Sequence, residues 1–389
     1  MTTIGIIAEY NPFHNGHLYH INKIKEMFPN SLIILILNGY FTQRGTLSIL
    51  TKEEKTKIAL ENNIDLVIEL PFIYGTQSSD IFAYNSIKLL NELQTEYLIF
   101  GSESNNIELL SKVADIQLND PNYQEEVKNY LNEGLNYPTA MAKALNINEE
   151  INNPNDLLGI SYIKAIKQLN SKIIPLTIQR TNDYHDTKSS SNIVSASNIR
   201  NKFNNNENID EYLPQNTISK LININDDDIF DLLKFKILTD KDLSIYLDVD
   251  EGLEYRLLKF INQAQSLDEF IYLIKTKRYT YNKINRMLIH ILIGLTKEDN
   301  KKSKVDYIKI LGFNKNGQEY LRKIKKDITL PTTPLKDSII LKYELLASYV
   351  YMKLTKQETY NFDLKNIPIK KDSVWTEPQK LDSLLVRGL

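Results

Sequence analysis

The sequence predicts an α/β fold, in which a parallel sheet flanked by helices is followed by an all-helical C-terminal part. Short apolar runs alternate with amphipathic segments through the first half of the chain, and this is the pattern of strands joined by crossover helices. A polar turn containing His14 and His17 follows the first apolar run directly. From residue 228 onward only helical periodicity recurs, so we expect no further strands there.

The predicted elements can be placed in chain order. We expect strands at 3–8, 31–37, 65–70, 96–101 and 172–178, with helices at 15–28, 51–62, 78–93 and 106–118. An insertion at about 120–170 is predicted to be helical, at 123–132, 139–145 and 154–169. Pro154, with Asn153 before it and Asn155 and Asp156 after it, marks the start of the last of these helices. The polar run 181–194 predicts a loop near a ligand.

The acidic, Asn-rich stretch 203–228 predicts a domain boundary. We expect a first domain at 1–205 and a helical second domain at 206–389. The candidate helices of the second domain are 230–238, 253–264, 267–274, 281–295 and 339–354.

The composition excludes several classes of protein. A hydrophobic fraction of 42% and a charged fraction of 25% are ordinary for a globular domain. The chain has no Cys, which excludes disulfides, thiolate metal sites and cysteine nucleophiles. The first strand begins too early for a signal peptide and no apolar run is long enough to span a membrane. We therefore expect a cytoplasmic protein with no membrane partner.

Positive charge is concentrated in one part of the chain. The net charge is −2, yet residues 271–371 carry 22 Lys and Arg against 9 Asp and Glu, a net of +13. Such a block favours a polyanionic partner, most simply nucleic acid. The alternative is a set of solvated helix faces in a Lys-rich protein.

The turn after the first strand carries the strongest chemical signal. Three of the five histidines lie at His14, His17 and His20. This turn opens a helix, whose N-terminus offers unpaired N–H groups and a partial positive charge to phosphate. Gly16 is expected to let the backbone approach a ligand closely. The alternative is a helix cap with incidental histidines.

Three further clusters follow other strands. Ser195, Ser197 and Arg200 begin a predicted helix, and their hydroxyls and guanidinium can bind phosphate oxygens, although Ser195 as a plain N-cap is the simpler interpretation. Gly101 follows the fourth strand, where a purine or ribose can pack on the backbone. Arg180 follows the fifth strand. The carboxyl ends of parallel strands are where such sheets bind phosphate ligands.

The pairing of His-x-Gly-His with a later Ser-x-Ser-x-Ile-Arg resembles the adenylyl-transferring nucleotidyltransferase superfamily, whose fold is Rossmann-like. The run from Ala8 to His17 closely resembles the start of the bacterial tRNA(Met) cytidine acetate ligase family. So do Gln43-Arg44-Gly45, the run Asp65–Pro71, Phe100-Gly101-Ser102-Glu103 and the run Pro154–Gly159. The likeness covers the whole N-terminal half, and it departs at Asp156, where Asn is common, and at Lys55, where Arg is common.

The resemblance implies a ligase that adenylates acetate with ATP and then acetylates the wobble cytidine of elongator tRNA(Met), giving N4-acetylcytidine. It implies Mg²⁺ as a companion of ATP, with no ligand set visible in the sequence. Histidines 14 and 17 would be catalytic, stabilising the phosphates during transfer. The implied ATP-binding residues are Ile7, Ala8, Glu9, Tyr10, Asn11, Pro12, Phe13, His14, Asn15, Gly16, His17, Leu18, Tyr19, His20, Gly101, Asn155, Arg180, Ser195, Ser197 and Arg200.

Contacts to RNA are expected elsewhere. The expected tRNA-binding residues are Arg44, Lys275, Lys277, Arg278, Lys323, Lys325 and Lys326. His185, in the polar loop, is either a base or an ordinary surface histidine. Two other functions stay open at this point: a small-molecule adenylyltransferase or cytidylyltransferase, and a non-catalytic, ATP-sensing RNA-binding protein. The sequence does not indicate an oligomeric state.

Overall fold

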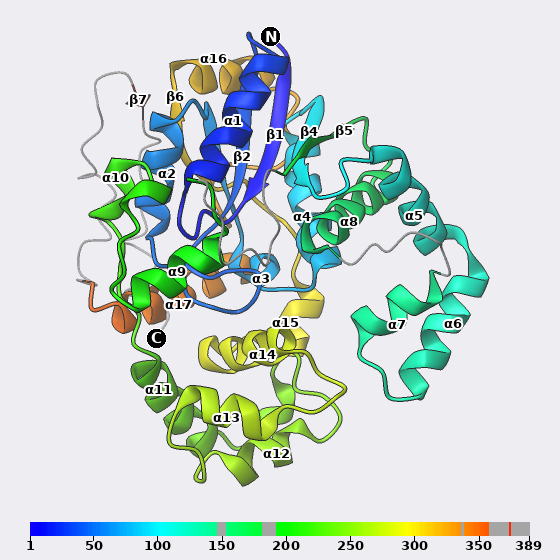
Figure 1. The fold of residues 1–389 in the computed structure, drawn as a ribbon, viewed down its shortest axis with the longest axis vertical. Helices are drawn as coiled ribbons and strands as arrows, with labels where there is room; N and C mark the ends of the chain where they lie inside the picture. Colours follow the sequence, from blue (N-terminus) through cyan, green and yellow to red (C-terminus); the bar gives the residue numbers. More distant parts are fainter. Residues whose placement is uncertain (146–152, 181–191, 336–337, 358–372, 375–389) are drawn as a thin grey trace.

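The computed structural model describes residues 1–145, 153–180, 192–335 and 338–357, together with the backbone of 373–374 (Figure 1). Its strands are β1 (Thr3–Ala8), β2 (Leu32–Asn38), β3 (Leu66–Leu70), β4 (Tyr97–Ser102), β5 (Ile174–Gln179), β6 (Ile310–Asn314) and β7 (Ser373–Val374). No described helix is long and apolar enough to cross a membrane.

The first half of the chain contains helices α1 to α9, most of them between strands. They are α1 (Asn15–Met27), α2 (Lys52–Glu61), α3 (Phe72–Gly75), α4 (Ser79–Glu92), α5 (Ile107–Asn119), α6 (Pro121–Asn132), α7 (Tyr137–Ala144), α8 (Pro154–Gln168) and α9 (Ala196–Asn204). The predicted strands and helices of this half therefore lie within a few residues of the observed ones.

The second half is mainly helical. It contains η1 (Asp210–Tyr212), α10 (Gln215–Ile218), α11 (Asp226–Thr239), η2 (Leu243–Ile245), α12 (Leu253–Phe260), α13 (Leu267–Ile274), α14 (Tyr281–Ile293), α15 (Lys297–Lys302), α16 (Lys315–Ile324) and α17 (Ile339–Leu354). Helices α11 to α14 form a lobe below the sheet in Figure 1, which we call the helical lobe (residues 226–293).

The strands form one sheet in the order β5-β4-β1-β2-β3-β6-β7. The five strands from the first half are parallel, and β6 pairs antiparallel with β3. The chain runs from β1 outward to β3 and then returns to the other side of β1 with β4. This reversal places a topological switch point at the carboxyl ends of β1 and β4, where α/β sheets bind ligands. The predicted α/β class is confirmed.

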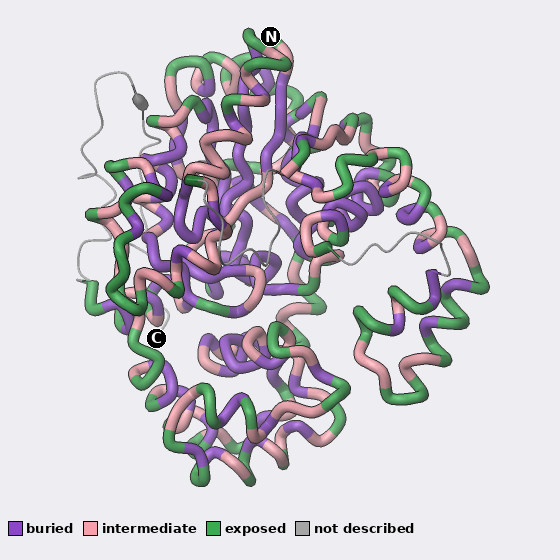
Figure 2. Tube along the Cα trace, in the orientation of Figure 1, coloured by how far each residue is buried: buried purple, intermediate pink, exposed green. Residues whose placement is uncertain are grey.

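Strand β2 shows why the sheet is covered on both faces. All seven of its residues are buried. Ile33 and Leu35 pack in the same cluster as Ile21 and Ile24 of α1, while Ile34 and Ile36 pack with Phe82 and other residues of α4 and α8. The alternation places successive side chains on opposite faces. Figure 2 shows the buried sheet at the centre, with α6 and α7 largely exposed at the periphery.

Strand β6 differs from the expectation of an all-helical second part. Gly312 lies against α2, where a Cβ would come within 2.9 Å of Cγ2 of Thr56 and 3.0 Å of Cδ1 of Leu60, so a larger residue there would require these side chains to shift. Asp65 then holds the strand's end, because its carboxylate accepts from the side chains of Asn314 (2.9 Å) and Asn316 (3.1 Å). The strand was missed because a five-residue run with a central Gly gives little periodicity. The predicted boundary at residues 205 and 206 stays a prediction.

Candidate active site

The turn of residues 14–17, which we call the histidine turn, is built by its own side chains. His14 is the N-cap of α1, and its Nδ1 accepts from the backbone N–H of Gly16 at 3.0 Å. The backbone N–H of His14 in turn donates to Nδ1 of His17 at 3.2 Å. A neutral imidazole that accepts at Nδ1 carries its proton on Nε2. Both histidines therefore have an Nε2–H to donate.

Electrostatics keeps these imidazoles neutral. Burial, together with the positive charges of Arg180 and Arg200, lowers the pKa of His14 to about 3, and burial is the largest cause. Burial also lowers the pKa of His17 well below its usual value, with contributions from His14, Arg180 and His20. The two rings stack with centroids 3.9 Å apart. At neutral pH both imidazoles are therefore uncharged, and each offers its Nε2–H as a hydrogen-bond donor.

Gly16 also has a role within the turn. A Cβ at this position would lie 2.7 Å from Cε1 of His14. The His14 ring therefore needs the space that Gly16 leaves, while the close approach of a ligand stays a prediction. The absence of a side chain at Gly16 lets the imidazole fold over the start of α1 and accept its cap hydrogen bond.

The second predicted motif lies beside the histidine turn. Arg200 donates from Nη1 to the backbone oxygen of Asn11 at 2.6 Å and from Nη2 to Oγ of Ser197 at 3.1 Å. Ser195 is the N-cap of α9, since its Oγ accepts from the N–H of Asn198 at 3.2 Å. The structure therefore brings together two motifs that are separated by about 180 residues in the sequence.

Residues after β4 and β5 form the next wall. Arg180 lies over Gly101, where a Cβ would be 3.3 Å from its Cγ. Asn155 donates from Nδ2 to Oε1 of Glu103 at 2.5 Å. Asp156 accepts from the backbone N–H groups of Glu103 (3.2 Å) and Ser104 (3.0 Å). Asp156 also accepts from Oγ of Ser102, so it holds the loop after β4 in place, a role that sequence spacing alone did not reveal.

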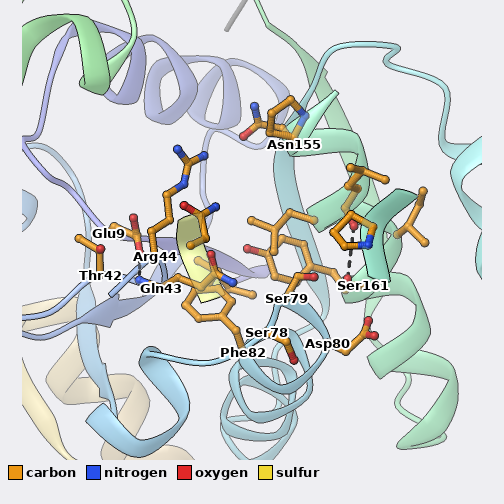
Figure 3. Close-up of a pocket in the computed structure, with 18 of the residues that line it drawn as sticks. Glu9, Thr42, Gln43, Arg44, Ser78, Ser79, Asp80, Phe82, Asn155 and Ser161 are labelled. Atoms are coloured by element: carbon orange, nitrogen blue, oxygen red, sulfur yellow. Dashed lines mark hydrogen bonds between the residues drawn. The ribbon is translucent and has the colours of Figure 1, made fainter. Parts of the chain in front are cut away.

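The histidine turn, the second motif, Arg180, Gly101 and Asn155 line one cleft of about 1400 Å³. Figure 3 shows the part of it around Glu9 and Asn155. The predicted ATP-binding residues that line the cleft are Ile7, Ala8, Glu9, Tyr10, Asn11, His14, Gly16, His17, Tyr19, His20, Gly101, Asn155, Arg180, Ser195, Ser197 and Arg200. Four predicted residues, Pro12, Phe13, Asn15 and Leu18, are not among its lining. Phe13 is fully buried in the core, and Asn15 donates instead to the backbone oxygens of Asn192 and Glu211.

The predicted tRNA-binding cations lie in two separate places. Arg44 and Arg278 line the cleft, and Lys275 and Lys277 lie in the same connection between α13 and α14. Helix α16, with Lys323 near its end, packs at the amino ends of the strands, because Tyr320 donates to the backbone oxygen of Leu93 at 2.8 Å. Lys325 and Lys326 directly follow it. Figure 1 shows α16 at the end of the molecule opposite to the helical lobe.

The contacts of two residues near the site, Lys55 and Gly45, could not be seen in the sequence. Lys55 is buried and donates from Nζ to the backbone oxygens of Glu9 (3.0 Å), Asn38 (2.7 Å) and Gly39 (2.6 Å). It thereby ties the carboxyl ends of β1 and β2 together. Gly45, with φ at +77°, lies against the backbone of α14 at Asn285 and Arg286, leaving no room for a side chain. This contact joins the loop after β2 to the helical lobe.

Two expectations find no test in the structure. His185 lies outside the described residues. Among the residues that are described, no group of three or more His, Asp or Glu side chains is placed to hold a metal ion, and the expected Mg²⁺ stays a prediction.

The chain matches known proteins over most of its length. The family model described as HIGH Nucleotidyl Transferase matches residues 1–366. A protein of Clostridium novyi named tRNA(Met) cytidine acetate ligase is 37% identical over 95% of this chain and 99% of its own. One of the same name from Caldicellulosiruptor saccharolyticus is 40% identical over 88% of this chain and 89% of its own.

Solved structures agree with the sequence relatives. Thermotoga maritima TmcAL in its apo form superposes with a TM-score of 0.84 at 29% identity, covering 91% of this chain and 95% of that one. The same protein bound with alpha-thio ATP gives 0.84 at 28%, covering 93% and 97%. These matches confirm the resemblance, and the chain belongs to the HIGH nucleotidyl transferase family and to the tRNA(Met) cytidine acetate ligases.

Proposed function

We propose that this protein activates acetate with ATP and transfers the acetyl group to the wobble cytidine of elongator tRNA(Met). The relatives' shared name specifies acetate, cytidine and tRNA(Met). The observation that carries the proposal here is the meeting of two neutral, Nε2-protonated histidines with Arg200 at the carboxyl end of β1. These donors and this positive charge suit the triphosphate of ATP, which is consumed when a carboxylic acid such as acetate is activated.

In the first step an acetate oxygen attacks the α-phosphorus of ATP, and the bond from that phosphorus to the bridging oxygen breaks to release pyrophosphate. Negative charge builds on the non-bridging and leaving oxygens. The Nε2–H groups of His14 and His17 are assigned to these oxygens. Preorganised donors in a buried site stabilise such charge more than water does.

The remaining residues position ATP. Arg200, Ser195 and Ser197 are assigned to the pyrophosphate end, where a guanidinium and two hydroxyls suit phosphate oxygens. Gly101, Asn155 and Arg180 are assigned to adenine and ribose. We assign any Mg²⁺ to the triphosphate itself, since the described residues offer no carboxylate cluster for it.

The second step needs an RNA base in the same cleft. The cytidine amine attacks the acetyl carbon of acetyl-adenylate, and the bond from that carbon to the phosphate oxygen breaks to release AMP. An anticodon-loop base must leave its stack to reach the cleft. We propose that it enters past Arg44 and Arg278, between the loop after β2 and the helical lobe, which makes residues 206–293 the RNA-facing part of the second domain.

The test is a single incubation with ATP, labelled acetate and bulk bacterial tRNA, followed by nucleoside analysis. We expect the label in N4-acetylcytidine, and acetate-dependent exchange of pyrophosphate into ATP when tRNA is omitted. Pyrophosphate exchange without any labelled nucleoside would contradict the proposal that tRNA is the acetyl acceptor. Absence of both would contradict acetate activation, and a labelled small-molecule product would favour a different transferase.

A further inference from the structure

Four carboxylates line the cleft among the described residues, and three of them lie beside a basic side chain. Asp80 accepts from Nζ of Lys164 at 2.8 Å. Asp248 lies 3.2 Å from Nδ1 of His290, and Glu251 lies 2.8 Å from Nη1 of Arg278. The fourth is Glu9, which takes part in no ion pair with the other residues described.

The hydrogen-bond partners of the Glu9 carboxylate are neutral, and the ammonium of Lys55 interacts with its charge without bonding to it. Oε1 of Glu9 accepts from the backbone N–H of Gln43 at 2.5 Å and from Nδ2 of Asn38 at 3.1 Å. Figure 3 shows the bond to Gln43 at the wall of the cleft. Lys55 donates to the backbone oxygen of Glu9 and not to its carboxylate. One carboxylate oxygen is therefore held in place, while Oε2 has no hydrogen-bond partner within the described part of the chain.

The histidines of the turn cannot take a proton in this cleft. Each accepts at Nδ1 from a backbone N–H, so the only nitrogen left to each is Nε2, which already carries hydrogen. Arginines at the site are charged at all working pH values. The Nε2 of His20 also has no partner among the described residues, but that atom is buried out of reach of a substrate. Of the carboxylates that line the cleft, Glu9 is the one with no ion pair in the described part of the chain.

The transfer step requires such an acceptor. The N4 amine of cytidine is a weak nucleophile because its lone pair is shared with the ring, and it must lose a proton as the new bond forms. A carboxylate is also the group that accepts from the N4 amino group of cytosine when proteins read that base, whereas uracil presents an acceptor there. One oxygen of Glu9 can thus serve both recognition and proton removal.

We propose that Glu9 is the general base of acetyl transfer. Resting on the proposed function, the step is balanced as follows: the N4–C bond forms, the bond from the acetyl carbon to the phosphate oxygen breaks, AMP leaves with that electron pair, and the N4 proton passes to Oε2 of Glu9. The proton is then released to solvent. This assigns the Glu9 side chain to the base rather than to ATP.

The test separates the two steps in Glu9→Gln. Its amide oxygen can accept from Gln43 and Asn38 as before, so the site keeps its shape while losing the base. We expect pyrophosphate exchange within about threefold of wild type, and single-turnover transfer from preformed acetyl-adenylate to tRNA slower by about 10²–10⁴-fold. Glu9→Asp, which keeps a carboxylate, should transfer faster than Glu9→Gln.

Glu125→Gln is the matched control, because it makes the same substitution at an exposed carboxylate that lies outside the cleft and has no ion pair among the described residues, so it should leave both steps unchanged. Transfer by Glu9→Gln within about threefold of wild type would overturn the assignment, and so would a parallel loss of exchange and transfer. A wild-type protein that forms acetyl-adenylate but acetylates no tRNA would instead overturn the proposed acceptor, and the role of Glu9 with it.

Discussion

The histidine turn gathers residues that are far apart in the sequence, whereas the basic stretch 271–371 is divided between two distant parts of the structure. At the turn, residues that are far apart in the chain meet: Arg200 donates to the backbone of Asn11 at 2.6 Å. In the basic stretch, residues counted together in the sequence separate. Arg278 lines the cleft, whereas Lys323 belongs to a helix at the amino ends of the strands.

The difference has a topological cause. Parallel strands deliver whatever follows them to one edge of the sheet, so polar residues after β1, β4 and β5 must converge. No such rule applies to a count of charges. Because β6 crosses the sheet edge antiparallel to β3, it carries the chain from the carboxyl edge back to the amino edge, and the lysines that follow it go with it.

The largest effect is expected at the turn itself. His17→Ala removes one Nε2–H donor and should lower acetate-dependent ATP–pyrophosphate exchange by about 10²–10³-fold, as loss of one oxyanion donor does. Lys23→Ala, on the exposed side of the same helix, should leave the exchange rate unchanged. Near wild-type exchange in His17→Ala would show that His17 has no catalytic role, although it lies beside His14 and the second motif.

Much of the turn could be predicted because its signals are local. Strand length, the break at Pro12 and the helix that begins after His14 all appear as periodicity and capping in short windows. The five parallel strands followed from them, whereas the pairing of the His and Ser/Arg motifs came from the resemblance to the nucleotidyltransferase superfamily.

What could not be predicted depends on contacts between distant segments. The three carbonyl partners of Lys55 come from residues 9, 38 and 39, and nothing in the sequence around Lys55 indicates them. The same holds for Gly45 against α14 and for β6, whose partners are more than 200 residues away. Such pairings are fixed by packing, not by propensity.

The second prediction concerns the cost of keeping His14 neutral. Its folded pKa is about 3, against about 6.5 in an unfolded chain. Between these values the unfolded chain binds a proton that the folded chain excludes, so the free energy of unfolding should fall as pH drops below about 6.5. The expected slope is about 1.4 kcal/mol per pH unit between the two pKa values, and above pH about 6.5 this cost is absent because His14 is neutral in both states.

Urea unfolding at a series of pH values measures this contribution. The His14→Gln variant lacks the titrating group, so its stability should fall less steeply than that of wild type between pH 6.5 and 5. No difference in slope between the two proteins would mean that the His14 imidazole binds protons equally well in the folded and unfolded states.

The third prediction compares two sets of cations with equal charge. Replacing Lys275, Lys277 and Arg278 by Ala should weaken tRNA binding and reduce the slope of log affinity against log salt by about 2. The same replacement of Lys323, Lys325 and Lys326 should have a smaller effect, because that set lies at the opposite edge from the cleft. Pyrophosphate exchange should be unchanged in both variants.

Filter binding of tRNA at several salt concentrations distinguishes the outcomes. Equal losses in the two triple variants would mean that tRNA spans both edges of the sheet and that the basic stretch acts as one surface after all. No loss in either variant would place the RNA contacts elsewhere.

The smallest effect is expected at Ser195, where one hydroxyl has two uses. As an acceptor its Oγ caps α9, and its O–H remains to donate to a phosphate oxygen. Ser195→Ala should therefore cost about 1 kcal/mol of stability and also slow exchange by up to about tenfold, the worth of one neutral hydrogen bond.

Asn106→Ala makes a matched control for Ser195, because the Asn106 side chain caps α5 by accepting from Leu109 at 3.0 Å. It should cost a similar amount of stability with no change in exchange. Should both variants slow exchange equally, the effect would reflect stability alone and Ser195 would be only a cap. If Ser195→Ala alone slows exchange, the Ser195 hydroxyl contacts ATP. Ser195 would then belong to the same ATP site as the histidine turn.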